Sequence, residues 1–257
     1  MIRGAGSRRQ AVPASGPLRP EPPPVTMPPM EPRDRTLTDF AAVDAVRARL
    51  IEQVPAPGHR RELLRSFIRR VILPAEVGLA PLAPAADRPP ADAETALARS
   101  VDILFQCLER GTLQSADLAD LSNAWNDGCP WRTGTRTGFP APGLAADPAR
   151  LAGDLAATLE WLAAPAVAML HPVAQSVLIS VRLTDLAPFP AGLFHLVRVT
   201  AWFPLLAAGC PPPLLQPDDA PRWLQALQAG LAYDTRPLAF LYRERIEAAF
   251  AALFLVV

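Results

Sequence analysis

The placement of proline constrains the fold of this chain more than any other sequence feature. Proline accounts for 31 of the 257 residues, and nine of these prolines fall within the first 32 positions. Because proline has no backbone N–H and clashes with the preceding helical turn, such a segment propagates neither a helix nor a sheet. We therefore expect residues 1–35 to form a disordered tail. Met27 and Met30 stand just before the first helical pattern, so the sequence leaves open whether residues 1–26 are translated.

Composition excludes several classes of function. The chain has 25 basic and 25 acidic residues, so it lacks the basic excess that drives nucleic-acid binding, and we expect no nucleic-acid partner. Every basic residue is arginine, which excludes a phosphate-binding P-loop lysine and a Schiff-base lysine. The absence of lysine, together with the excess of alanine and proline, is typical of codon bias in a GC-rich, bacterial-type genome.

The cysteines, the histidines and the uncharged stretches indicate neither a metal site nor a membrane-spanning helix. Cys107, Cys129 and Cys210 are too scattered for a disulfide framework or a metal-binding pair, which favours a reducing cytoplasm. The three histidines are too dispersed for a zinc site. Residues 161–181 and 199–217 lack charges, but prolines interrupt both stretches. We therefore interpret them as buried helices and expect no membrane partner.

Apolar residues recur at helical spacing along most of the chain and predict an all-α fold of about eight helices. We divide the folded part into an N-terminal helical region, residues 36–110, and a core, residues 111–257. A Pro/Ala-rich stretch, residues 74–92, is expected to be a linker within the first region. Residues 128–146 are rich in Gly, Pro and Thr, which favours an extended loop or a short β-hairpin.

Several residues mark the ends of the expected helices. Thr38 and Ser115 are suitable N-caps, and Gly111 is suited to the left-handed residue that ends a helix. Asp147-Pro148 and His171-Pro172 each place a proline at the first position of a helix.

The second half of the chain contains an ordered series of short motifs. His171-Pro172 opens a helix, and sixteen residues later stands the segment Ala-Pro-Phe-Pro-Ala-Gly-Leu-Phe-His-Leu-Val-Arg, residues 187–198. An apolar run and a Gly-Cys-Pro-Pro turn follow, and then a tail from Asp218 to Leu241 with regularly spaced Asp, Arg-Trp, Pro-Leu and Phe-Leu pairs. Upstream lies Phe-Pro-Ala-Pro, residues 139–142.

In order and spacing, residues 125–246 resemble the Fic (Fido) domain. Members of that family transfer AMP from ATP, or less often another phosphate-containing group, onto a protein hydroxyl. Their motif is HPFx(D/E)GNGRxxR, and residues 139–142 resemble the start of the family's flap. The resemblance implies a Fic-like helical bundle with a short hairpin flap and a protein as target or partner.

Compared position by position, the motif of this chain is degenerate. Ala187 stands where the family has the histidine that serves as general base, and Ala191 stands where it has the carboxylate that holds Mg²⁺. Neither alanine can supply that chemistry. Of the glycines in the phosphate-binding turn only Gly192 remains, and His195 replaces the first arginine while Arg198 keeps the second. The resemblance implies Gly192, His195 and Arg198 as candidate nucleotide-binding residues, with no catalytic residue and no metal ligand.

Three functional hypotheses remain open. The first is a catalytically inactive pseudoenzyme that binds a protein partner beside the loop 130–142, with no cofactor. The second is an active nucleotidyl- or phosphoryl-transferase with an altered site that uses His195, Arg198, ATP and Mg²⁺. The third is a helical domain whose likeness to the Fic family arose by chance.

The roles of the remaining polar groups also have a plainer interpretation. For His195 a helix-packing role is favoured over that of a displaced base, and for Arg198 an intramolecular salt bridge is favoured over phosphate binding. Some Fic proteins carry an inhibitory helix whose Ser/Thr-x-x-x-Glu-Gly/Asn motif blocks the second arginine. This chain has no clean copy, because Thr95, Ser100 and Glu109-Arg110-Gly111 have the wrong spacing.

Overall fold

The computed structural model describes residues 39–79, 92–126, 131–133 and 147–255, and in these ranges the chain is all-α without a strand. The expected tail and most of the expected hairpin lie outside the described residues. The α-helices are α1 (Ala41–Gln53), α2 (Pro57–Phe67), α3 (Leu73–Leu79), α4 (Ala93–Arg110), α5 (Ser115–Asn126), α6 (Leu151–Ala163), α7 (Pro165–Ala168), α8 (Pro172–Leu186), α9 (Leu193–Ala207), α10 (Ala220–Leu231) and α11 (Arg236–Phe254).

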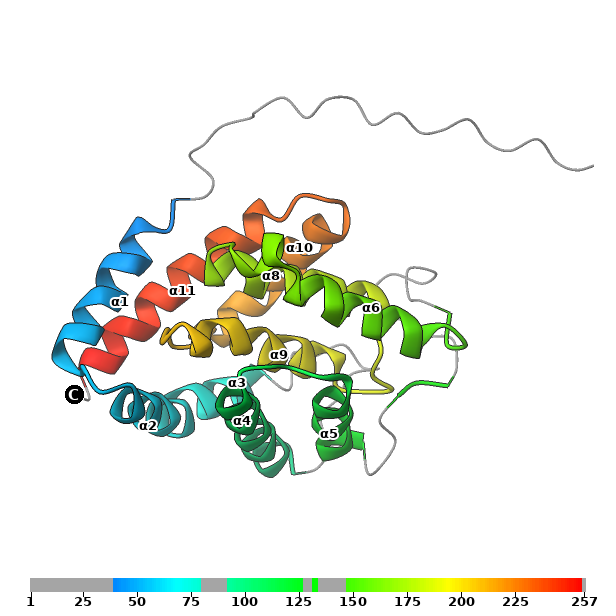
Figure 1. Cartoon of the computed structure of the whole chain (residues 1–257), viewed down its shortest axis with the longest axis horizontal. Helices are drawn as coiled ribbons and strands as arrows, with labels where there is room; N and C mark the ends of the chain where they lie inside the picture. The colour runs from blue at the N-terminus through cyan, green and yellow to red at the C-terminus, as the bar shows by residue number, and fades with distance from the viewer. Residues whose placement is uncertain (1–38, 80–91, 127–130, 134–146, 256–257) are drawn as a thin grey trace, which may run out of the picture. The chain divides into compact units, whose positions relative to one another are not determined.

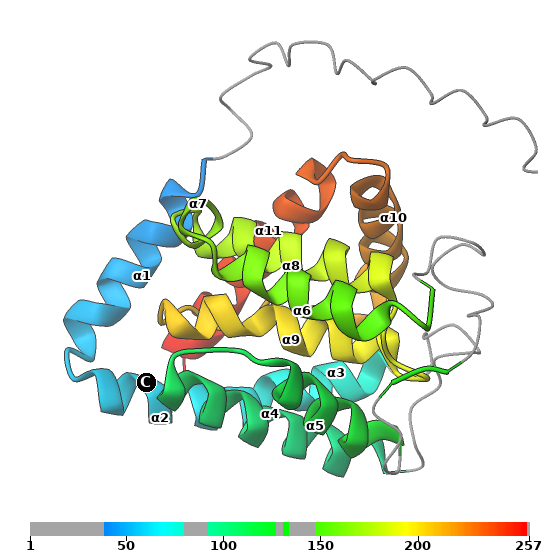
Figure 2. The same ribbon diagram turned by 45° about the vertical axis from the view of Figure 1, so that its right-hand side comes forward.

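The antiparallel pair α8 and α9 forms the centre of the helical core, and Figures 1 and 2 show the other helices around it. Helices α6, α10 and α11 pack on α8, whereas α4 and α5 pack on α9. Nearly every residue of α9 is buried, which is what a helix that is apolar on all sides requires. The prediction of buried helices for the uncharged stretches is confirmed for most of α8 and α9, but it was wrong for residues 161–170, which are mostly exposed, and for residues after Ala207, where α9 has ended. No helix of the described part is both long enough and apolar enough to cross a bilayer.

Local signals position two of the helices at the ends that the sequence predicts. The Asp92 carboxylate accepts a hydrogen bond from the Thr95 N–H at 3.2 Å at the start of α4, and Gly111 ends this helix with φ of 76°. At the start of α8, His171 Nδ1 accepts from the Val173 N–H at 3.2 Å, and Pro172 occupies the first helical position.

Two of the predicted helix starts were wrong. Helix α1 begins at Ala41 with Phe40 as its N-cap, rather than Thr38, which lies outside the described residues, and the Asp39 carboxylate accepts from the Ala41 N–H at 2.9 Å. Helix α6 begins at Leu151, because the residues after Asp147-Pro148 first form a turn.

The predicted linker 74–92 was wrong at its beginning, because residues 73–79 are helical. A π-helical turn (η2, Ile68–Ile72) joins α2 to α3, and the Leu73 N–H donates to the Ile68 carbonyl. The turn directly precedes Pro74, which cannot donate a helical hydrogen bond. One extra residue in the turn changes the phase of the following helix by about 100°. The direction in which α3 presents its side chains is therefore set by this turn.

The closest approach among the described glycines is made by Gly230 of α10 against α8. A Cβ at Gly230 would lie 2.6 Å from the Val181 Cγ2, whereas a Cβ at Gly153 of α6 would meet nothing within 4 Å. The β-branched side chain of Val181 has little rotamer freedom with which to move aside.

We expect Gly230→Ala to lower the free energy of unfolding by about 1–3 kcal/mol, because overpacking outweighs the gain in helix propensity. The matched control Gly153→Ala should raise it by up to about 1 kcal/mol, because only propensity changes there. Urea unfolding monitored by circular dichroism measures both. Equal effects of the two substitutions would contradict the close packing of α10 on α8.

Candidate functional site

The loop between α8 and α9 contains the degenerate motif and has two residues in the left-handed region. Ala187 ends α8 with φ of 44° and is fully buried. Gly192 precedes α9 with φ of 71°, and a Cβ there would lie 3.3 Å from the Trp125 ring. Gly192 is therefore required by its backbone conformation and by the ring against it, whatever its part in binding a phosphate.

Two polar residues outside the predicted set hold this loop. The Arg132 Nε donates to the Ala187 carbonyl at 2.7 Å, and its backbone N–H donates to the Pro188 carbonyl at 3.0 Å. The Asn126 side-chain amide donates to the Ala191 carbonyl at 3.3 Å. Sequence reasoning missed Arg132, although an arginine next to Trp131 in a Gly/Pro-rich stretch was a signal that could have found it.

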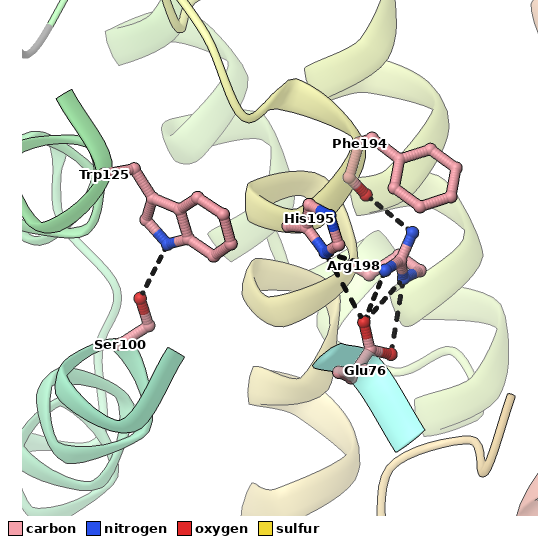
Figure 3. Close-up of polar contacts among 6 residues, drawn as sticks. All are labelled: Glu76, Ser100, Trp125, Phe194, His195 and Arg198. Atoms are coloured by element: carbon pink, nitrogen blue, oxygen red, sulfur yellow. Dashed lines mark hydrogen bonds and ion pairs between the residues drawn. The ribbon is translucent and has the colours of Figure 1, made fainter. Parts of the chain in front are cut away.

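A buried ion pair occupies the position where the resemblance implies phosphate binding. Arg198 Nε lies 3.1 and 3.3 Å from the two carboxylate oxygens of Glu76, and its Nη2 donates to the same carboxylate. Its Nη1 donates to the Phe194 carbonyl at 2.9 Å. Both partners of the pair are no more than 2% exposed. Figure 3 shows Glu76 of α3 facing Arg198 of α9. The salt bridge expected for Arg198 is therefore present.

Aromatic rings enclose the pair. The Arg198 guanidinium lies 4.0 Å from the centroid of the Phe194 ring and 5.2 Å from that of Trp223. The rings of Phe194 and Trp223 contact each other edge to face, with centroids 5.1 Å apart. A large ring thus fills space beside Arg198 where the family's second glycine would leave room for a phosphate.

His195 completes the buried cluster. Its Nδ1 lies 3.0 Å from Arg198 Nη2 and 3.8 Å from the Glu76 carboxylate, and its ring stacks on Trp125 with centroids 5.0 Å apart. The side chain is fully buried. His195 thus has the helix-packing role favoured from the sequence, and it is buried more completely than the sequence suggested.

Sequence reasoning missed Glu76, because Pro74 and the surrounding alanines made the segment resemble a linker. A signal was available, however. Glu76 is the sole charged residue between Arg70 and Asp87. A single charge in such an apolar stretch indicates a buried partner of opposite charge.

Electrostatics explains how Glu76 stays charged in the core. Burial raises the pKa of the Glu76 carboxyl, but the charge and hydrogen bonds of Arg198, together with His195, outweigh this effect and lower the pKa to about 2. Because the folded-state pKa lies below the ordinary value of 4.5, the pair stabilises the fold above that value. This stabilisation is lost as the pH falls from about 4.5 toward 2.

Solved structures with a similar arrangement are Fic-domain proteins. Fic-1 (residues 134–508) from C. elegans superimposes with a TM-score of 0.61 at 14% identity, over 85% of this chain and 71% of that one. A Fic domain containing signaling protein from Bacteroides thetaiotaomicron gives 0.62 at 11% identity over 82% and 95%, and a Fic family protein from Desulfovibrio desulfuricans gives 0.56 at 16% over 87% and 75%.

The chain has the Fic fold. At these identities the likeness concerns the architecture alone. No family model and no curated protein sequence matches the chain.

Glu76, which pairs with Arg198, lies in α3, and its surroundings lack the motif of the family's inhibitory helix. The residues weighed earlier for this role lie elsewhere in the described structure. Ser100 accepts a hydrogen bond from the Trp125 indole N–H at 3.1 Å, and Arg110 pairs with Asp117. The glutamate thus comes from α3 rather than from α4.

The motif residues do not fit a Mg²⁺–nucleotide complex. Ala191 offers no carboxylate, and the nearby carboxylate of Glu76 is already bound to Arg198. Among the described residues, no group of three His, Cys, Asp or Glu side chains could hold a metal ion. We therefore derive no reaction step through a metal or nucleotide.

We expect Glu76→Gln to destabilise the protein by about 3–5 kcal/mol at pH 7, because it leaves the Arg198 charge buried without a counterion. The difference from the wild-type protein should shrink as the pH falls from about 4.5 toward 2, where the wild-type carboxyl becomes neutral as well. Urea unfolding across this pH range measures it.

The control is Glu244→Gln, which removes an exposed glutamate paired with Arg222 and should change stability by less than about 1 kcal/mol. A Glu76→Gln effect that stays constant down to pH 2.5 would contradict the buried ion pair.

Proposed function

We propose that this protein is a Fic-fold pseudoenzyme that does not transfer nucleotides and acts by binding a protein partner. One observation carries the proposal. The one motif arginine left for a phosphate is buried and bound by Glu76, while Ala187 and Ala191 occupy the positions of base and metal ligand. The loss of a positioned base alone typically costs about 10²–10⁴-fold in rate.

The altered-site transferase finds less support. His195 and Arg198 are in contact, but both are buried, so a nucleotide would reach them only if elements packed around them, α3 with Glu76 among them, moved away. Such a movement would separate a buried charge pair, which is energetically costly. The proposal therefore favours binding over transfer.

A hollow beside the degenerate loop is our candidate for the partner site. It has a volume of about 610 Å³ and lies between residues 131–133 and the start of α6, with Trp131, Pro148, Leu151 and Ala152 in its wall. Trp131 also stacks on Phe189 of the loop, so this wall is joined to the motif. The wall also includes Arg132, Thr133 and Asp147, so it suits a peptide segment that presents apolar side chains beside polar or charged ones.

We expect ATP at up to millimolar concentration to cause no Mg²⁺-dependent shift in the melting temperature, because the proposal predicts that no nucleotide binds. A ligand that binds only the folded state would raise the melting temperature. We also expect no label on any target protein from labelled ATP. A label that disappears in His195→Ala, in a variant that melts at the wild-type temperature, would instead establish the altered-site transferase.

We expect Ala152→Arg to weaken the capture of a crosslinked partner at least about tenfold, because a long side chain replaces a methyl group in the wall and occupies space in the hollow. Ala156→Arg is the matched control, since it lies one turn along the exposed side of α6, outside the residues that line the hollow. Deletion of residues 130–142 should also abolish capture. Quantitative pull-down measures all three, and undiminished capture by the deletion variant would refute this site.

A further inference from the structure

A second hollow, of about 300 Å³, lies at the end of the α8–α9 pair remote from the motif loop. Gln175, in the first turn of α8, and Phe203, in the last turns of α9, contribute to its wall. The motif loop joins the opposite ends of the same two helices. Helices α6 and α7 and the turn after Gly111 close the remaining sides. The hollow is therefore separate from the site described above.

The wall of this hollow is apolar and, among the described residues that form it, without charge. Its apolar lining includes Leu162, Val167, Ile179 and Phe203. The polar side chains in the wall are those of Thr112 and Gln175. Because the transfer of an unpaired charge into such surroundings is very unfavourable, a charged ligand would be rejected.

Hydrogen bonds restrict what Gln175 can offer a ligand. Its side-chain nitrogen donates to the Ala168 carbonyl at 3.1 Å and to the Leu170 carbonyl at 2.7 Å, which ties the turn after α7 to α8. Both N–H groups of the amide are thus used, and its carbonyl oxygen can act as an acceptor. A ligand would therefore be oriented by donating one hydrogen bond.

Backbone features keep the hollow open. Gly111 has φ of 76° and turns the chain away from α4, and Pro204 lies within α9. The four-residue helix α7 is held at its end by Gln175. Water molecules find few hydrogen-bond partners there, because the wall is mostly apolar and a buried water usually needs two to four polar partners.

We propose that this hollow binds an uncharged, mainly apolar small molecule that donates a hydrogen bond to the Gln175 carbonyl oxygen. A volume of about 300 Å³ lies at the lower end of the range for small-molecule pockets. Binding is driven by the removal from water of the apolar surfaces of the ligand and of the wall of the hollow. The site is independent of the proposed function at the motif loop.

A pair of related fluorescent probes tests the proposal. N-phenyl-1-naphthylamine is uncharged and has one N–H donor, whereas 1-anilinonaphthalene-8-sulfonate has the same rings and N–H with an added negative charge. Fluorescence titration of the full chain should show saturable binding of the amine to one site, and binding of the sulfonate weaker by at least about tenfold. Equal binding of the two probes, or no saturable binding of the amine, would overturn the proposal.

Two variants place the probe in the structure. Ala163 and Ala168 lie at the rim of the hollow and are exposed, so Ala163→Phe and Ala168→Phe add bulk there without overpacking the core. Each should weaken amine binding by at least about tenfold. The matched control Ala156→Phe lies on the same helix outside the wall and should bind as the wild type does.

Circular dichroism and the melting temperature establish whether each variant is folded. If one rim variant is unfolded, the other one provides the test. Amine binding that is unchanged in a folded rim variant, or weakened equally in the control, would assign the probe to another surface and refute the site.

Discussion

The buried ion pair between Glu76 and Arg198 joins two helices that are far apart in the sequence. It links α3, near the start of the described chain, to the central helix α9 across 122 positions of sequence. Two opposite charges in an apolar core are tolerated only when their geometry and hydrogen bonds are good. Here Nε and Nη2 contact the carboxylate while Nη1 reaches the Phe194 carbonyl. The position of α3 on α9 follows from this requirement.

The same pair decides what surrounds Arg198 in this Fic fold. In the family that this chain resembles, the second arginine faces a phosphate. Here that arginine has a carboxylate, a carbonyl and two aromatic rings around it. Such surroundings satisfy the guanidinium without a ligand. Arg198 is thereby part of the core of the described structure.

The extent of successful prediction differs between elements for physical reasons. Helix α4 has its cap, apolar face and terminal glycine within one short stretch, and it ends at Gly111 as predicted. Helix α3 was missed because Pro74 normally breaks a helix, and the π-helical turn that accommodates it leaves no pattern in the sequence. The salt bridge of Arg198 was anticipated, but Glu76 as its partner was not. The contact of Arg132 with the Ala187 carbonyl was also missed. Both contacts join segments that are distant in the sequence, so no local pattern indicates them.

The sequence by itself determined the all-α class, the central helix pair and the likeness to the Fic fold. These properties depend on local periodicity and on residue types at fixed spacing. Only the tertiary structure decided which carboxylate meets Arg198 and which ring stacks on His195. It also decided that α6 to α9 enclose an uncharged hollow. Those contacts depend on the direction in which packed helices present their side chains, and one extra residue in a single turn is enough to change it.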